Sequence, residues 1–410
     1  MSPPRANPRL SHPPVGLSRR PYGNLAQGAA LQVSPFSLGT MRALGSAAQM
    51  EAVLRAALAA GINHLETAPA YGPAERFLGQ ALRQLQAEGQ EPEGGWLITS
   101  KVLPGCDLEN GQHQLRAILN RLGVAQLSHL AVHGLNRPEH LAWALEGDGA
   151  ALLAWAQDSG VAAAVGFTSH GSIALIEQAL TSGRFSFCGL HLHLFDRTRL
   201  ALAKSALADG IGVLAISPAD KGGRLYDPPL QLQADCAPFH PLELAYRFLL
   251  EQGISTLSLG AEKPSDLAWA VALGGPSSSH GGWGQCSPPT PELSPEVAGA
   301  VARLDAAQAE RLGAERCGQC RACLPCPSAV PIPELLRLRN LALAHGMAAF
   351  AQERYNLIGR AGHWWEEFNA EACQRCGDCI PRCPHNLPIP DLLADTHRHL
   401  AAAPRRRLWG

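Results

Sequence analysis

Short apolar segments alternate along the first 275 residues with longer segments whose apolar positions recur at three- and four-residue intervals. The longer segments, such as MEAVLRAALAAG and LELAYRFLLEQG, have the periodicity of amphipathic helices. The short ones are rich in β-forming residues, and we expect strands near residues 33, 63, 96, 129, 162, 187, 212 and 255. Strand–helix units repeated at a spacing of roughly thirty residues predict an α/β fold, a (β/α)8 TIM barrel.

A doubly wound open sheet would show the same alternation. Its dinucleotide-binding form usually carries G-x-G-x-x-G after the first strand, and no such motif follows the first predicted strand here. In a barrel, chemistry belongs at the carboxyl ends of the strands. The side chains at those ends are Glu66 after the second strand, Tyr71 in the loop that follows, Lys101 closing the third strand and His133 closing the fourth.

The composition changes after the predicted barrel. Residues 274–295 are rich in glycine, serine and proline, which is typical of a flexible linker. The first eighteen residues are polar and rich in proline, as expected of a disordered tail. The predicted organisation is therefore a tail over 1–18, a barrel over 19–273, a linker over 274–295 and a second domain over 296–410.

Eight of the twelve cysteines lie in two blocks, CGQCRACLPCP and CQRCGDCIPRCP. The second block is the full C-x2-C-x2-C-x3-C-P run of bacterial ferredoxins, and the first is one residue shorter before its fourth cysteine. This spacing lets one tight loop present three thiolates to a cubane, so the blocks predict two 4Fe–4S clusters. The predicted iron ligands are Cys317, Cys320, Cys323, Cys326, Cys373, Cys376, Cys379 and Cys383.

The two blocks form an internal repeat, because CPSAVPIPELL matches CPHNLPIPDLL in phase. The fourth cysteine of such a run usually reaches the other cluster. We therefore expect crossed ligation, in which Cys383 joins the first three cysteines and Cys326 joins the second three. The segment between the blocks has helical periodicity and predicts a small, mainly helical ferredoxin-like iron–sulfur domain. Two four-cysteine zinc sites are the alternative, but they would explain neither the third cysteine nor the following proline.

The stretches LGTMRALGS, GINHLETAPAYGPAERFLGQAL, ITSK and LAVHG resemble the aldo/keto reductase family. More narrowly, the chain from about Arg19 onward resembles the subgroup with a C-terminal 4Fe–4S ferredoxin-type domain. The resemblance implies a catalytic set of Tyr71, Lys101 and His133, with Glu66 where the family usually has aspartate. Tyr71 would be the general acid, with its pKa lowered by Lys101, and His133 would orient the carbonyl.

The resemblance also implies an NADP(H) site and assigns it residues after several strands. These cofactor-binding candidates are Gly39, Thr40, Thr168, Ser169, Ser217, Gly222 and Lys263. The match weakens at two other positions, since the family's usual glutamine maps to Gly189 and its stacking aromatic to Ile216. Weak or lost nicotinamide binding therefore remains an alternative.

The net charge of −1 gives no electrostatic reason to expect a nucleic acid or an anionic membrane as partner. Clustered cysteines without a secretory signal indicate metal in a reducing, cytoplasmic compartment. We expect an iron–sulfur oxidoreductase acting on a small carbonyl or alcohol substrate, with ferredoxin or another electron carrier as partner. The alternative is an electron-transfer or binding protein whose barrel no longer performs nicotinamide-dependent hydride transfer.

Overall fold

The computed structural model describes residues 18–25, 28–219, 224–274, 292–359 and 368–402. Most of the predicted linker, the predicted tail up to residue 17 and Gly222 lie outside these ranges. The chain divides into two compact units. The first comprises Met1–Gly222 and Ala245–Ser294, and the second comprises Gly223–Leu244 and Pro295–Gly410.

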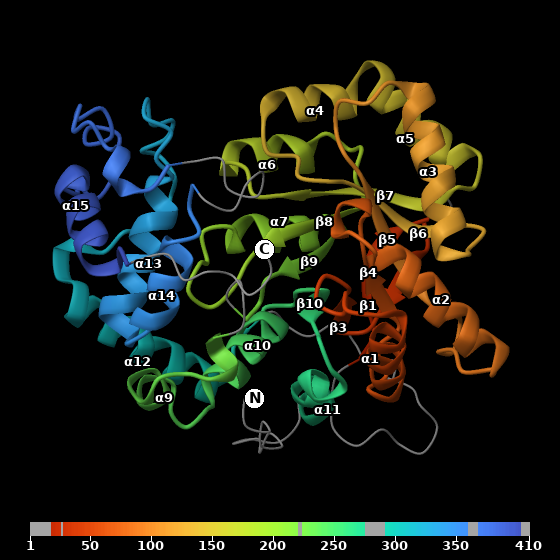
Figure 1. Ribbon diagram of the computed structural model, residues 1–410, viewed down its shortest axis with the longest axis horizontal. Coiled ribbons are helices and arrows are strands. Elements are labelled where there is room, and N and C mark those ends of the chain that lie inside the picture. The colour runs from red at the N-terminus through yellow and green to blue at the C-terminus, as the bar shows by residue number, and fades with distance from the viewer. Residues whose placement is uncertain (1–17, 26–27, 220–223, 275–291, 360–367, 403–410) are drawn as a thin grey trace. The chain divides into compact units, whose positions relative to one another are not determined.

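The first unit is a closed barrel of parallel strands, which confirms the predicted barrel (Figure 1). Neighbouring strands follow in chain order, and β10 pairs with both β9 and β3 to close the ring. The barrel strands are β3 (Phe36–Gly39), β4 (His64–Glu66), β5 (Leu97–Val102), β6 (Leu127–Val132), β7 (Ala162–Ser169), β8 (Phe187–His191), β9 (Gly212–Ile216) and β10 (Thr256–Gly260).

Helices follow the strands and cover the outside of the barrel, so the apolar strands are buried on both faces (Figure 1). Side chains of Ser46, Asp107 and Ser172 cap the first turns of α1, α3 and α6. The helices of this part of the chain are α1 (Ala47–Ala59), α2 (Ala74–Ala87), α3 (Leu108–Leu122), α4 (Pro138–Leu145), α5 (Gly147–Asp158), α6 (Ile173–Thr181), α7 (Leu200–Ala208), α10 (Pro241–Glu251) and α11 (Ala268–Gly274), with 3₁₀ turns η1 (Pro69–Tyr71) and η3 (Pro264–Leu267).

An antiparallel hairpin that the sequence patterns did not predict precedes the barrel. It pairs β1 (Arg20–Asn24) with β2 (Ala30–Val33). Tyr22 in β1 is buried, and its ring centroid lies 4.9 Å from that of His129 and 5.0 Å from that of Phe187. Because Phe187 begins β8, the hairpin closes the amino-terminal end of the barrel.

The second unit consists of helices and connecting loops. Its core contains leucines of α13 and α15 together with Cys323, Cys379 and Cys383. The segment before α10 belongs to this unit: Asp235 of α9 forms an ion pair with Arg311 of α12. The helices are α9 (Leu230–Cys236), α12 (Pro295–Leu312), α13 (Ile332–His345), α14 (Ala348–Tyr355) and α15 (Ile389–Leu400), with 3₁₀ turns η2 (Arg224–Tyr226), η4 (Gly313–Glu315) and η6 (Ala370–Ala372).

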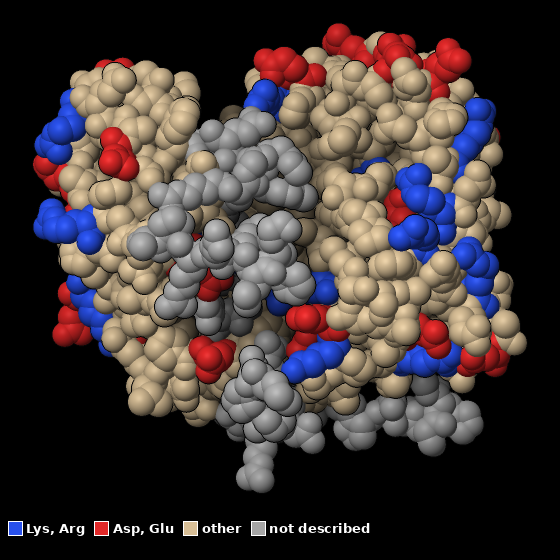
Figure 2. Space-filling view, viewed as in Figure 1, with Lys and Arg blue, Asp and Glu red and all other residues tan. Residues whose placement is uncertain are grey.

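Basic and acidic side chains are interspersed over the face drawn in Figure 2, in keeping with the near-zero net charge. Among the described helices, none has the length and apolarity needed to cross a membrane.

Candidate functional site

The structure brings the four predicted catalytic side chains together at the carboxyl end of the barrel. Glu66 ends β4, Lys101 lies in β5, His133 follows β6, and Tyr71 ends η1 in the loop after β4. Parallel pairing of β4 with β5 and of β5 with β6 places these strand ends side by side. The four side chains therefore form one group, as expected from the strand ends.

The phenol hydroxyl of Tyr71 is the centre of this group. Lys101 Nζ donates to Tyr71 Oη at 3.0 Å, and Tyr71 Oη in turn donates to Glu66 Oε1 at 3.2 Å. Lys101 also forms an ion pair with Glu66 and donates to the carbonyl of Thr67 at 2.8 Å. Both charged side chains are buried, with Lys101 only 2% exposed. The rings of Tyr71 and His133 meet edge to face, with centroids 5.9 Å apart.

The pKa of Tyr71 differs from the sequence-based expectation. Burial and the neighbouring Glu66 carboxylate raise this pKa to about 12, and together they outweigh the ammonium of Lys101, which lowers it. The expectation of a lowered pKa was wrong because it counted Lys101 without the buried carboxylate beside it. The phenol is therefore protonated throughout the neutral range.

The two basic side chains of the site, Lys101 and His133, differ in protonation at neutral pH. Burial alone would lower the pKa of Lys101, but Glu66 and Tyr71 raise it overall, so the ammonium is retained. Burial, followed by the charges of Lys101 and His170, lowers the pKa of His133 to about 3. His133 is therefore a neutral imidazole at neutral pH. It can donate a hydrogen bond without adding charge.

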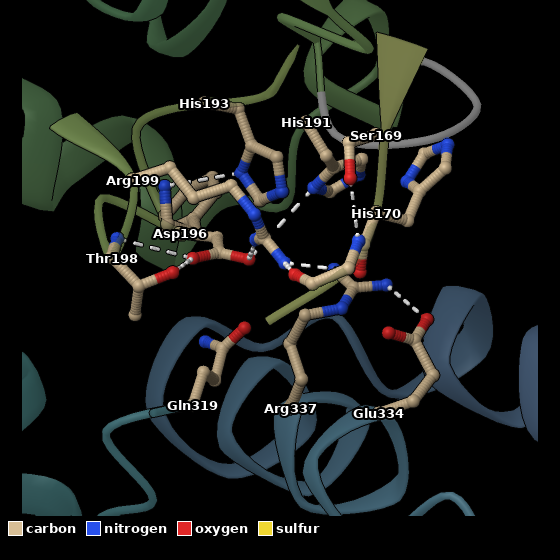
Figure 3. A network of polar contacts seen from close by, with 12 residues as sticks. Ser169, His170, His191, His193, Asp196, Thr198, Arg199, Gln319, Glu334 and Arg337 are labelled. Atoms are coloured by element: carbon tan, nitrogen blue, oxygen red, sulfur yellow. Dashed lines mark hydrogen bonds and ion pairs between the residues drawn. The ribbon is translucent and has the colours of Figure 1, made fainter. Parts of the chain in front are cut away.

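A second polar group, which the sequence patterns did not predict, lies at the carboxyl end of the barrel. His191 ends β8, and the following turn brings Asp196 back so that its Oδ2 lies 3.8 Å from His191 Nδ1 (Figure 3). Thr198 donates to Asp196 Oδ1 from its hydroxyl at 2.6 Å and from its backbone at 3.2 Å. Arg199 Nη1 lies 3.7 Å from Asp196 Oδ2, and its Nη2 donates to the carbonyl of Gly171 at 3.0 Å.

His191, His193 and Asp196 could each offer one ligand atom to a metal ion, since these atoms lie within 4.8 Å of one another. Mixed imidazole and carboxylate donors suit zinc or iron. The guanidinium of Arg199 already faces the same carboxylate oxygen, however, and supplies the positive charge that a cation would bring. Burial would raise the pKa of Asp196, but the hydrogen bond from His191 and the charge of His193 bring it well below its usual range. We interpret the group as a neutralised buried network. Its one sequence signal is the H-x-H spacing at a strand end.

In the second unit, the two cysteine blocks line two separate pockets. Cys317, Cys320, Cys323 and Cys383 line the first. Cys326, Cys373, Cys376 and Cys379 line the second, and Cys323 lines both. The fourth cysteine of each block thus lies in the pocket of the other block.

The backbone repeats along with the cysteines. Residues with positive φ recur at matching places in the two blocks, at Gln319 and Arg375, Arg321 and Gly377, and Ala329 and Asn386. Matching hydrogen bonds recur as well: Ala329 N donates to Cys326 O at 3.0 Å, and Asn386 N donates to Cys383 O at 3.1 Å. The internal repeat in the sequence is therefore a structural duplication.

The barrel is similar to known proteins in sequence and in fold. The sequence model of the aldo/keto reductase family matches residues 35–229. The match runs from β3 through β9 and covers slightly less than half of the chain. No curated protein matches the chain.

Solved aldo-keto reductases share the fold of the barrel. The enzyme AKR11C1 from Bacillus halodurans, in its holo form, is 18% identical, covers 69% of this chain and 96% of its own, and gives a TM-score of 0.55. The protein PA4992 from Pseudomonas aeruginosa is 23% identical, covers 62% of this chain and 94% of its own, and gives a TM-score of 0.50. At these identities the likeness concerns the fold alone.

Within the barrel, several side chains that were predicted to contact a cofactor form hydrogen bonds with other parts of the protein. Thr40 Oγ1 donates to Thr67 Oγ1 at 2.9 Å, and Ser169 Oγ donates to Leu135 O at 2.6 Å. Thr168 Oγ1 accepts from the Gly134 backbone at 2.9 Å. The remaining described candidates are Gly39 at the end of β3, Ser217 after β9 with a φ of 57°, and Lys263, which is exposed.

The position to which the family's nicotinamide-binding glutamine maps is occupied by Gly189 and is tightly packed. A Cβ added to Gly189 would lie 3.0 Å from Thr168 Cγ2 and 3.1 Å from Ile216 Cδ1. A glutamine side chain could enter only if both neighbours moved. The residues at this position therefore do not fit the contact that the family resemblance implied.

Proposed function

We propose that this protein is an iron–sulfur oxidoreductase that interconverts a small carbonyl compound and its alcohol in the barrel. Two 4Fe–4S clusters in the second unit would exchange the electrons with an external carrier such as ferredoxin. The observation that carries the proposal is the pair of cysteine pockets with exchanged fourth cysteines, in a chain that also holds a buried Tyr71–Lys101–Glu66 group.

The barrel residues supply the proton chemistry of this reaction. Converting a carbonyl to an alcohol consumes two electrons and two protons: one proton must reach the carbonyl oxygen, and the other forms the new C–H bond at the carbonyl carbon together with the two electrons. Tyr71 carries a proton at neutral pH and is half-buried, so its hydroxyl can donate to a substrate oxygen. Lys101 fixes the hydroxyl and compensates the phenolate that remains after transfer, while neutral His133 can donate to the same oxygen.

The second unit supplies four cysteine thiolates for each cluster, the ligands that a 4Fe–4S cluster requires. Cys317, Cys320, Cys323 and Cys383 would hold one, and Cys373, Cys376, Cys379 and Cys326 the other. When bound, each cluster supplies electrons one at a time, so a pair matches the two-electron demand of the barrel reaction.

One observation favours the alternative of an electron-transfer or binding protein. Gly189 lacks the side chain that would hold a nicotinamide carboxamide, and its surroundings are tightly packed.

Metal analysis and nucleotide titration of the anaerobically purified chain test the proposal. We expect iron and sulfide in equal amounts and a brown protein, whereas stoichiometric zinc in a colourless protein would refute the cluster assignment. Titration with NADPH and NADH then separates the two functions. Reduction of the clusters or saturable binding would support a nicotinamide-dependent reductase. Intact clusters with no binding of either nucleotide would refute the nicotinamide-dependent version of the proposal.

A further inference from the structure

The two pockets differ in charge at equivalent positions of the duplicated loop. After its second cysteine the first block continues with Arg321 and Ala322, whereas the second block continues with Gly377 and Asp378. Arg321 lines the pocket of Cys317, Cys320, Cys323 and Cys383, and Asp378 lines the other pocket. The first loop therefore presents a cation to its pocket, and the second loop presents an anion to the other pocket.

Among the residues that line the pockets, no other ionisable side chain cancels this difference. Apart from cysteines, His385 is the only further ionisable residue among those that line either pocket, and it lies with Arg321. Arg375 is exposed and forms an ion pair with Asp391, so its charge is compensated. Arg382 is exposed and donates to the carbonyl of Pro325 at 3.0 Å, without lining the pocket itself.

The backbone gives no reason for an arginine in the first loop. Arg321 has a φ of 65°, in the left-handed region, and its counterpart Gly377 has a φ of 86°. Glycine adopts this conformation freely, whereas a side chain is strained there. The loop would be more relaxed with glycine, as the second block shows, so the distinguishing property of Arg321 is its charged side chain.

A backbone hydrogen bond also favours negative charge in the first pocket. The amide of Gln319 donates to Cys317 Sγ at 3.4 Å. Hydrogen bonds to ligand sulfurs and nearby positive charges stabilise the more negative, reduced state of a cluster, and nearby negative charges destabilise it.

We propose that the two clusters differ in reduction potential, and that Arg321 and Asp378 set the order. The cluster held by Cys317, Cys320, Cys323 and Cys383 has the higher potential and accepts an electron first. The cluster beside Asp378 is the stronger reductant. This inference rests on the proposed function, because it requires both clusters to be present.

A potentiometric titration of the anaerobically purified full chain, followed by electron paramagnetic resonance, tests the order. The wild type should show two resolved midpoint potentials. Arg321→Gly should lower the higher potential alone, by at least a threefold change in the reduction equilibrium constant; a tenfold change corresponds to 59 mV. Asp378→Asn should raise the lower potential alone. Arg321→Lys, which keeps the charge, is the matched control and should leave both potentials in place.

Each other outcome overturns the inference. Two equal potentials in the wild type would do so, as would Arg321→Gly leaving the higher potential unchanged or moving the lower one. Arg321→Gly relaxes the backbone, so loss of fold is not expected to obscure the result. Iron and sulfide contents are measured first. Failure of the clusters to form would refute the proposed function, whereas intact clusters in the wrong order would refute only the inference.

Discussion

The hydroxyl of Tyr71 lies between a buried cation and a buried anion, and this balance governs its chemistry. Lys101 alone would make the phenol more acidic, but burial and Glu66 keep the proton on the oxygen. The group therefore resists ionisation in the absence of substrate. It can donate a proton only when a substrate oxygen becomes basic enough to accept one.

Removing this hydroxyl should affect turnover without affecting the metal. For Tyr71→Phe we expect carbonyl reduction to fall by about 10²- to 10⁴-fold, because a positioned proton donor is lost. Iron content and thermal unfolding should match the wild type. Activity is measured with the physiological or an artificial electron donor. Retained turnover would remove Tyr71 from the role of acid.

Breaking the buried ion pair should affect stability as well as turnover. Lys101→Met leaves Glu66 charged and unpaired, 8% exposed, and should cost about 3–5 kcal/mol of unfolding free energy. Glu66→Gln combined with Lys101→Met removes both charges and should recover much of that loss. Urea denaturation of the two variants gives the comparison. A double variant as unstable as the single one would contradict this account of the pair.

Buried histidines should make the barrel lose stability in acid. Burial lowers the pKa of His129 to about 4, against 6.5 for an unfolded chain. Between these values the unfolded state binds more protons, so stability falls as the pH falls from about 6.5 towards 4. The contribution of His129 approaches about 3 kcal/mol at the acid end.

Denaturation at a series of pH values measures this slope. His129→Gln should flatten it, even if the substitution lowers stability at neutral pH. The exposed His113 offers a control, because His113→Gln should leave the slope as it is. An unchanged slope in the His129 variant would show that the acid sensitivity arises elsewhere.

At the scale of elements, the duplicated cysteine loops are the most regular feature of the chain. Each loop is followed by a helix, α13 or α15, that begins with proline at the same position. This shared frame explains how two loops of different sequence form matching pockets. The exchange of the fourth cysteines between the two pockets can be tested by measuring the iron content of cysteine variants.

Pairs of cysteine variants distinguish crossed from uncrossed ligation. Under crossed ligation, Cys326→Ser with Cys376→Ser damages one cluster, and about half the iron should remain. Cys326→Ser with Cys320→Ser damages both, and little iron should remain. Uncrossed ligation predicts the reverse order. Iron and sulfide assays on anaerobically purified protein decide between them.

The sequence predicted the strands and the cysteine loops because each depends on a local pattern. It predicted the proximity of the four barrel residues because the carboxyl ends of the strands meet at one end of a barrel. Periodicity marks strands, and short fixed spacings mark the cysteine loops. Features that depend on tertiary burial escaped prediction. The β1–β2 hairpin is short and carries proline, Asp196 reaches His191 only through a turn, and the pKa of Tyr71 depends on how deeply Glu66 is buried.

At the scale of the whole molecule, the two units should respond differently to loss of metal. The core of the second unit includes Cys323, Cys379 and Cys383 among its leucines, so removing the clusters leaves gaps at its centre. Limited proteolysis after iron chelation should cut within residues 295–402, while the barrel remains resistant. Equal resistance of both units before and after chelation would show that the second unit folds without metal.

The assignment of residues 223–244 to the second unit has a consequence for how this unit could be lost from the chain during evolution. The chain leaves the barrel after β9, contributes α9 to the second unit and returns to the barrel at α10 before it completes the ring. A gene fragment that ends at residue 294 would still encode α9, with Leu232 and Cys236 deprived of the helix α12 against which α9 packs. Loss of residues 295–410 would therefore expose these two apolar side chains unless the segment 223–244 changed as well.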